Sequence, residues 1–122
     1  MQPSPKLLAL MAQAMPLLLL GEHPALSVLQ AQYALSQIGG VEFTGAGVFV
    51  HFEVPSGVPL CDPPSMSGGS IHIELAGVRN GAGCALFVRE GRLSMFEGFT
   101  YGDEWPMNPD VVALREAVPI KP

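Results

Sequence analysis

The amino-acid sequence predicts an α+β fold in which two N-terminal helices pack on one face of an antiparallel meander of about four or five strands. Apolar residues recur at helical spacing as far as about residue 38, and they alternate with polar residues between about 41 and 101. Two dipeptides, Asn80-Gly81 and Glu90-Gly91, are typical of tight β-turns because turn residues of this kind adopt positive φ angles. Strong helices before the strands favour this fold over a β-sandwich, which is the alternative.

The first helix is expected over about residues 5–15. Pro5 suits the first helical turn, and Pro16 should end or kink the helix because proline cannot donate a hydrogen bond to the carbonyl of Ala12. The expected apolar stripe has the spacing of one helix face. It comprises Leu7, Leu8, Met11, Ala14, Met15 and Leu18.

The second helix is expected from about Pro24 to Ile38, with Gly39-Gly40 as its C-terminal cap because glycine adopts the left-handed conformation easily. The two edges of its apolar face comprise Leu26, Leu29 and Tyr33, and Val28, Ala31, Leu35 and Ile38. The polar remainder of the helix is uncharged and comprises Ser27, Gln30, Gln32, Ser36 and Gln37.

Alternating side chains predict short strands over about 41–44 and 48–54, followed by a loop over 55–69 that is rich in Pro, Gly and Ser. A three-stranded unit is expected over about 70–101. If both turn dipeptides form two-residue turns, Ile73 faces Val88 and Leu86 faces Met95. Residues 102–122 are expected to form an extended or weakly helical tail with one short helical turn.

The two turns together give the three-stranded unit one consistent apolar face, which we assign to the core. That face comprises Ile71, Ile73, Leu75, Leu86, Val88, Leu93 and Met95. The opposite face is of mixed polarity and is expected to be hydrated. It comprises His72, Glu74, Phe87, Arg89, Arg92, Ser94 and Phe96.

Length and composition indicate one globular domain over residues 1–122. The chain is 48% hydrophobic and 14% charged, which is not the composition of a disordered protein. Its formal net charge is −5 with six Lys and Arg residues, so we expect no nucleic-acid partner. The apolar stretch 6–20 is short and interrupted, so we interpret it as a buried helix and expect no membrane partner; an export signal is the alternative.

The cysteines and the glycine-rich turns suggest no cofactor. Cys61 and Cys84 are the only two cysteines and lack metal-ligand spacing, so we expect reduced thiols in a cytoplasmic protein. The Gly45-x-Gly47 and Gly81-x-Gly83 pairs do not precede a helix, which argues against a phosphate-binding loop. We therefore predict no cofactor.

Three segments of the chain resemble a family of small bacterial proteins without an assigned activity. They are residues 44–55 (TGAGVFVHFEVP), 80–88 (NGAGCALFV) and 93–106 (LSMFEGFTYGDEWP), which together cover about a third of the chain. The resemblance implies a small bacterial cytosolic protein. Similar small α+β proteins often act as immunity or partner-binding proteins, an analogy at the level of the fold, and the resemblance supplies no catalytic residues.

The first candidate site consists of two His-x-Glu pairs, His51 with Glu53 and His72 with Glu74. If the two strands are antiparallel neighbours, His51 opposes Glu74 and Glu53 opposes His72. Two imidazoles and two carboxylates would then form a ligand set that suits zinc. The simpler interpretation is a set of polar cross-strand pairs on a hydrated sheet face.

The second candidate is the acidic aromatic segment, residues 97–105, in which acids alternate with aromatic residues. Phe99, Tyr101 and Trp105 would anchor a protein partner, while Asp103 and Glu104 would attract a basic one. The alternative is that the aromatic rings fold back and seal the end of the core. Both interpretations hold together if Trp105 packs inward while the two acids face solvent.

These features favour a non-enzymatic protein-interaction domain, of the immunity type or similar, that uses the acidic aromatic segment and the mixed sheet face. The alternative is a small metal- or ligand-binding enzyme that uses the two His-x-Glu pairs. A third hypothesis is a homodimer formed through an edge strand.

Overall fold

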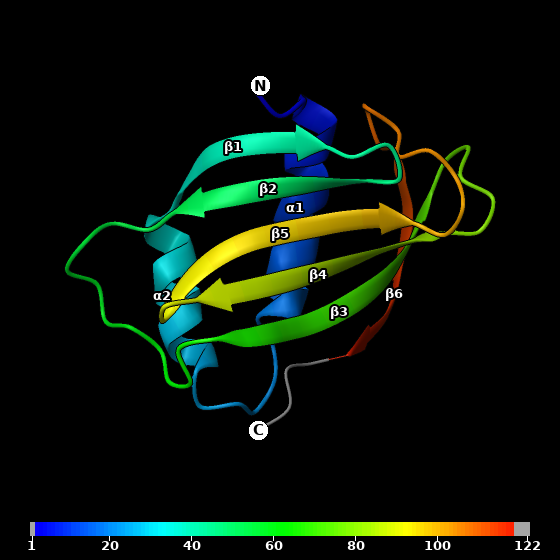
Figure 1. The fold of residues 1–122 in the computed structure, drawn as a ribbon. Helices are drawn as coiled ribbons and strands as arrows, with labels where there is room; N and C mark the ends of the chain where they lie inside the picture. The colour runs from blue at the N-terminus through cyan, green and yellow to red at the C-terminus, as the bar shows by residue number, and fades with distance from the viewer. Residues whose placement is uncertain (1, 119–122) are drawn as a thin grey trace.

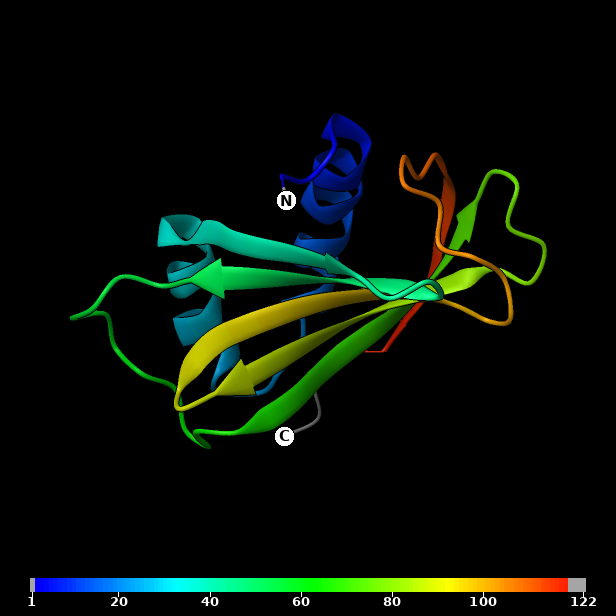
Figure 2. The ribbon, with the colours of Figure 1, turned by 45° about the horizontal axis from the view of Figure 1, so that its top comes forward.

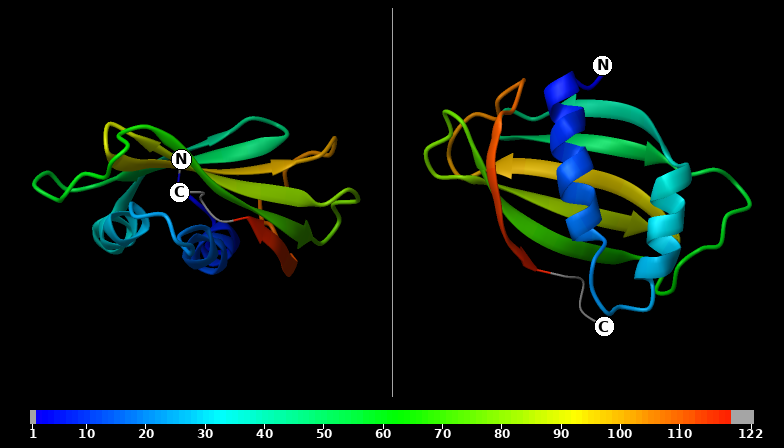
Figure 3. Two further views of the ribbon diagram at one scale, coloured as in Figure 1. Left: turned by 90° about the horizontal axis from the view of Figure 1, so that it is seen from below. Right: turned by 180° about the vertical axis from the view of Figure 1, so that it is seen from behind.

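The computed structural model describes residues 2–118, which form two helices and one six-stranded antiparallel sheet. The helices are α1 (Pro5–Leu18) and α2 (Leu26–Leu35), and both lie on one face of the sheet (Figures 1 and 3). The strands are β1 (Gln37–Phe43), β2 (Gly47–Glu53), β3 (Met66–Leu75), β4 (Ala82–Arg89), β5 (Arg92–Thr100) and β6 (Val111–Val118). The predicted α+β class is confirmed, with six strands where four or five were expected.

The strand order is β1-β2-β5-β4-β3-β6, so the sheet is not one continuous meander. β1 and β2 form a hairpin, and β3, β4 and β5 form a three-stranded meander whose last strand pairs with β2. The chain between β2 and β3 therefore passes the ends of two strands, and Figure 2 shows it as a long loop beyond one end of the sheet. Among residues 2–118, no helix is long and apolar enough to cross a membrane.

The hydrophobic core lies between the two helices and the inner face of the sheet. α1 packs across β3, β4 and β6, and α2 packs against β5. The largest fully buried side chains include Phe96, Leu7, Leu10, Met15, Leu18, Leu29, Ile71, Ile73, Leu86 and Leu93. The predicted inner face of the three-stranded unit is confirmed except at Met95.

Helix α1 continues three residues beyond the predicted end and contains Pro16. The missing proline N–H affects only the carbonyl of Ala12, an exposed residue that water can reach, while Leu18 gains full burial. Leu8, predicted to be in the stripe, is 42% exposed, and Leu10 is buried in its place. The helix is therefore rotated slightly from the predicted orientation.

Helix α2 is shorter than predicted, because it ends at Leu35 and the chain is extended at Ser36. Ile38 and Gly40 belong to β1, where Ile38 pairs with Phe52. The Gly39-Gly40 pair is thus part of a strand with a β-bulge, and its prediction as a helix cap is wrong.

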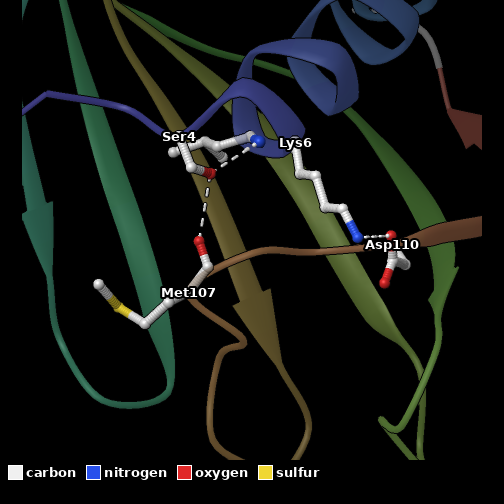
Figure 4. A network of polar contacts seen from close by, with 5 residues as sticks. Ser4, Lys6, Met107 and Asp110 are labelled. Carbon is white, nitrogen blue, oxygen red and sulfur yellow. Dashed lines mark hydrogen bonds and ion pairs between the residues drawn. The ribbon is translucent and has the colours of Figure 1, made fainter.

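The predicted tail is also wrong, because residues 111–118 form β6, which pairs antiparallel with β3 at the edge of the sheet. The segment before β6 is held by the start of α1 (Figure 4). Ser4 caps the helix by accepting from the N–H of Leu7 at 3.1 Å, and its hydroxyl donates to the carbonyl of Met107 at 3.3 Å. Lys6 Nζ lies 2.5 Å from a carboxylate oxygen of Asp110.

The Asn80-Gly81 dipeptide is not a two-residue turn. Residues 76–81 form a longer connection, and Ile73 pairs with Ala82 instead of Val88. The pairing partner moves by six residues, and because side chains alternate with a period of two, each residue of β3 keeps its predicted face.

The Glu90-Gly91 turn is confirmed, with φ angles of 53° and 77°. Beyond this turn the register changes, because Val88 pairs with Leu93 but Phe87 pairs with Met95. Ser94 is the extra residue of a β-bulge. The bulge reverses the predicted faces of β5, so that Phe96 lies fully inside and Met95 lies outside.

A buried amide connects the helices to the sheet. The side chain of Gln32 in α2 is 1% exposed. Its Nε2 group donates to the carbonyls of Pro59 and Gly91, both at 2.9 Å, and its Oε1 accepts from the N–H of Leu93 at 2.8 Å. The prediction that Gln32 belongs to the polar remainder of the helix is wrong, since every polar group of its amide points into the protein.

The loop before β3 is fastened to the same β4–β5 turn. The N–H of Cys61 donates to the carbonyl of Gly91 at 2.9 Å, and the N–H of Gly91 donates to the carbonyl of Pro64 at 2.7 Å. A Cβ atom at position 91 would lie 2.8 Å from Cβ of Leu60, so only glycine fits between the loop and the turn.

Replacing Gln32 by Ala should destabilise the protein by about 2–4 kcal/mol, because the buried N–H of Leu93 would lose its acceptor. Urea denaturation measures the loss. Gln13→Ala, at an exposed position of α1, is the matched control and should change the free energy of unfolding by less than about 0.5 kcal/mol. Equal stabilities of the two variants would show that the buried amide is not a structural link.

The bulge in β5 predicts opposite effects at adjacent positions. Phe96→Ala should cost about 3–5 kcal/mol because it opens a cavity in the core, whereas Met95→Ala should cost less than about 1 kcal/mol on the uncovered face. The same denaturation experiment compares the two variants. A larger loss for Met95→Ala would support strict alternation along β5 and contradict the bulge.

Candidate functional site

The face of the sheet opposite the helices, called here the outer face, carries the candidate site. In Figure 1 this face is turned toward the viewer and both helices lie behind it. The side chains that alternate with the core residues point outward from each strand. The larger half-buried apolar side chains among them are Phe49 on β2, Phe87 on β4, and Met95 and Phe99 on β5.

The pairing registers place the outward positions of β2, β5 and β4 in three rows. The row nearest the β4–β5 turn reads His51, Met95 and Phe87. The middle row reads Phe49, Glu97 and Ala85. The row nearest the other end reads Gly47, Phe99 and Gly83. Glu97 is therefore at the centre of this nine-position grid.

Three rings form a cluster at the third row, where Phe99 and His72 lie on either side of Gly83, and Tyr101 follows just beyond it. Tyr101 is stacked on His72 with ring centroids 6.1 Å apart, and it meets Phe99 edge-on at 5.6 Å. Glycines make room for this cluster. A Cβ atom at Gly81 would lie 2.7 Å from the His72 ring, and one at Gly83 would lie 2.5 Å from Cζ of Phe99.

The 76–81 connection and the end of β3 enclose a cleft of about 430 Å³ next to these rings. Its polar lining comes from His72, Glu74, Arg79 and Asn80. Glu74 is paired with Arg115 of β6 at 3.4 Å. The cleft thus combines a stacked imidazole with charges of both signs.

The predicted convergence of the two His-x-Glu pairs is wrong. His51 and Glu53 lie on β2, whereas His72 and Glu74 lie on β3, and β5 and β4 separate these strands. The predicted register assumed that strands consecutive in sequence are neighbours in the sheet. His51 instead contacts Glu42 of β1, with Nε2 2.6 Å from Oε1.

Neither a metal-ligand cluster nor an exposed cysteine is found in the described part of the chain. No three His, Cys, Asp or Glu side chains of residues 2–118 gather as metal ligands. Cys61 and Cys84 are buried and unpaired. Burial raises the pKa of the Cys84 thiol to about 12, so this group stays protonated and serves as a packing residue.

The acidic aromatic segment divides between the core and the surface. Trp105 is 5% exposed, and a Cβ atom at Gly98 would lie 2.5 Å from its ring, so the indole packs on the inner face of β5. Tyr101 is 48% exposed and Glu104 is exposed, whereas Phe99 and Asp103 are half-buried. The combined interpretation fits Trp105, which packs inward, and Glu104, which is exposed, whereas Asp103 is half-buried.

Backbone contacts fix the position of this segment. The N–H of Trp105 donates to the carbonyl of Gly45 at 2.7 Å. Asn80 donates from its backbone to Oδ2 of Asp103 at 3.3 Å and from Nδ2 to the carbonyl of Tyr101 at 3.2 Å. Tyr101 and Asp103 are therefore held in place by the connection that contains Asn80.

Glu97 lies in a different environment from Asp103 and Glu104. Partial burial raises the pKa of its carboxyl group above the ordinary glutamate value. Its cross-strand neighbours, Phe49 and Ala85, replace water with apolar groups on both sides. The charged carboxylate consequently lacks part of its hydration in the folded protein.

Sequence reasoning missed the apolar character of this face and the central position of Glu97. It placed Phe96 outside and Met95 inside because nothing in the stretch around Ser94 signals a bulge. The outward position of Phe87 was predicted, whereas the pairing of Phe49 with Glu97 depends on β2 lying beside β5. Comparison with known protein families, with curated proteins and with solved structures finds no match to this chain.

Glu97→Gln should stabilise the protein at pH 7. The raised pKa means that the folded state binds the proton more tightly than the unfolded chain, so stability falls as the pH rises through the folded-state pKa and stays lower at neutral pH. Thermal melting should show a higher melting temperature for Glu97→Gln at pH 7, and the difference should shrink below about pH 4. Glu22→Gln, at an exposed position between the helices, is the control; a lower melting temperature for Glu97→Gln would contradict the prediction.

Proposed function

We propose that this chain is a non-enzymatic protein-interaction domain that binds a protein partner on the outer face of its sheet. The observation that supports this proposal most directly is the set of half-buried aromatic and apolar side chains on a face that neither helix covers (Figure 3). Aromatic residues and methionine are enriched in the centres of protein interfaces. An apolar sheet face bordered by charges is the surface that such an interface needs.

The surroundings of this apolar patch favour a partner with basic groups. Glu97 lies at the centre of the patch, Asp103 and Glu104 follow Tyr101 in the chain, and the whole chain carries a formal net charge of −5. Charges at the rim act mainly on the rate of association, while central aromatic residues act mainly on dissociation. Tyr101, half-exposed and backed by Phe99, is the ring best placed to anchor a partner.

Among protein-interaction domains we favour an immunity-type or similar cytoplasmic role, on the analogy of small bacterial α+β proteins. A second copy of the chain is another possible occupant of the same face. The separation of the two His-x-Glu pairs on strands that are not neighbours argues against the metal-dependent enzyme.

Affinity capture with matched variants tests the proposal. Wild-type protein is compared with Tyr101→Ala/Glu104→Gln, called here the outer-face variant, which removes the exposed ring beside Phe99 and the exposed acid three residues after it. Leu20→Ala/Glu22→Gln changes a similar pair between the helices and is the control. We expect a partner that wild type and control retain and the outer-face variant loses, with affinity reduced by about tenfold or more when the purified pair is measured by calorimetry.

Two further measurements separate the alternatives. Light scattering of the purified chain identifies a homodimer, which the outer-face variant should dissociate if a second copy covers this face. Glu104→Gln alone should slow association and reduce its dependence on salt, with little effect on dissociation. A partner retained equally by all variants would place the interaction elsewhere and contradict the proposal.

A further inference from the structure

The centre of the outer face contains a carboxylate whose surroundings are unusual for a surface acid. An acid on a hydrated sheet is normally opposed by a polar or cationic residue on the adjacent strand. Glu97 is opposed by Phe49 on one side and Ala85 on the other. Its neighbours two residues away on the same strand and face are Met95 and Phe99.

The diagonal positions of the grid supply no cation for this carboxylate. On β2 they are Gly47 and His51, and the imidazole of His51 is engaged by Glu42 at 2.6 Å. On β4 they are Gly83 and Phe87. The ion pairs found within residues 2–118 are Lys6–Asp110, His51–Glu42 and Arg115–Glu74, and none of them involves Glu97.

This environment destabilises the isolated folded protein, and it favours a complex with a partner that carries a cation. Partial desolvation without an opposite charge weakens the folded state, as the raised pKa of Glu97 indicates. A partner that brings a cation to the carboxylate restores the lost electrostatic stabilisation. The surrounding aromatic rings add to the attraction for a cation when water is excluded.

We infer that Glu97 is the receptor for a lysine or arginine side chain of the protein partner, held within the apolar surroundings formed by Phe49, Phe87, Met95 and Phe99. The inference rests on the proposed function and specifies the chemistry that the outer face recognises. The partner presents one basic side chain flanked by apolar groups. The alkyl stem of that side chain packs on the apolar neighbours while its charged end meets the carboxylate.

The same geometry determines specificity. A neutral or acidic side chain at this point of a partner would leave the Glu97 carboxylate buried without a counterion. A wrong partner therefore loses binding free energy through the desolvation of Glu97. This loss exceeds the contribution that an exposed surface ion pair makes. Glu97 should act mainly through discrimination between partners, and the rings should supply most of the contact area.

Short synthetic peptides test this inference without knowledge of the partner. Isotope-labelled wild-type protein is titrated with acetyl-Leu-Arg-Leu-amide and with acetyl-Leu-Gln-Leu-amide, and the side-chain carboxyl carbons and backbone amides are followed by NMR. We expect the arginine peptide to shift the Glu97 carboxyl resonance and the amides of Phe49 and Ala85 saturably. Its affinity should exceed that of the glutamine peptide by about tenfold, as a charge-assisted hydrogen bond implies.

Two variants make the test specific. Glu97→Gln keeps the shape of the side chain and should abolish the preference for arginine, while Glu22→Gln should retain it. Equal affinities of the two peptides for wild type, a preference that survives in Glu97→Gln, or shifts confined to other acids would each overturn the inference.

The outcomes also distinguish this inference from the proposed function. If a captured partner is lost by Tyr101→Ala/Glu104→Gln but binds Glu97→Gln as tightly as wild type, the interaction domain stands and the role of Glu97 is refuted. If wild type prefers the arginine peptide but no protein partner depends on the outer face, the cation site stands and the proposed function is refuted.

Discussion

The buried amide of Gln32 is the contact on which the arrangement of the two layers depends. It satisfies the carbonyl of Gly91 and the N–H of Leu93 at the start of β5, and it also holds the carbonyl of Pro59 in the loop before β3. A polar group in this position is stable only when all its hydrogen bonds are made, so it permits one placement of α2 against the sheet. Apolar packing alone would tolerate small shifts of the helix.

This junction explains why the sheet does not follow the order of the sequence. The loop after β2 does not turn back to pair with its own strand; it runs to the β4–β5 turn, where Cys61 and Pro64 hydrogen-bond with Gly91. β3 therefore starts at the far side of the meander, and the place beside β2 is left for β5. Contacts between residues so distant in sequence have no local signal, which is why the two His-x-Glu pairs could not be placed relative to each other from sequence.

Turn chemistry and hydrophobic periodicity predicted the features of the fold that depend on residues close together in the sequence. The Glu90-Gly91 turn, both helices and the inner positions of β3 and β4 follow from turn chemistry and periodicity, and the structure confirms them. Three features of the fold were not predicted, because they depend on contacts between residues distant in sequence or on a single added residue. β6 forms only because β3 offers a free edge, the 76–81 connection is fixed by Asn80 contacts with the acidic aromatic segment, and the bulge at Ser94 has no sequence signature.

That bulge links the fold to the candidate site. Without the extra residue, alternation from Leu93 would turn Glu97 into the core and Phe96 toward solvent, which would bury a charge and expose a large ring. With it, Phe96 completes the core, while Glu97 appears on the outer face between Phe49 and Ala85. The carboxylate and its apolar surroundings are thus consequences of one backbone irregularity. Bulges often re-aim side chains near functional sites, and here the redirected side chain is the one acid at the centre of the uncovered face.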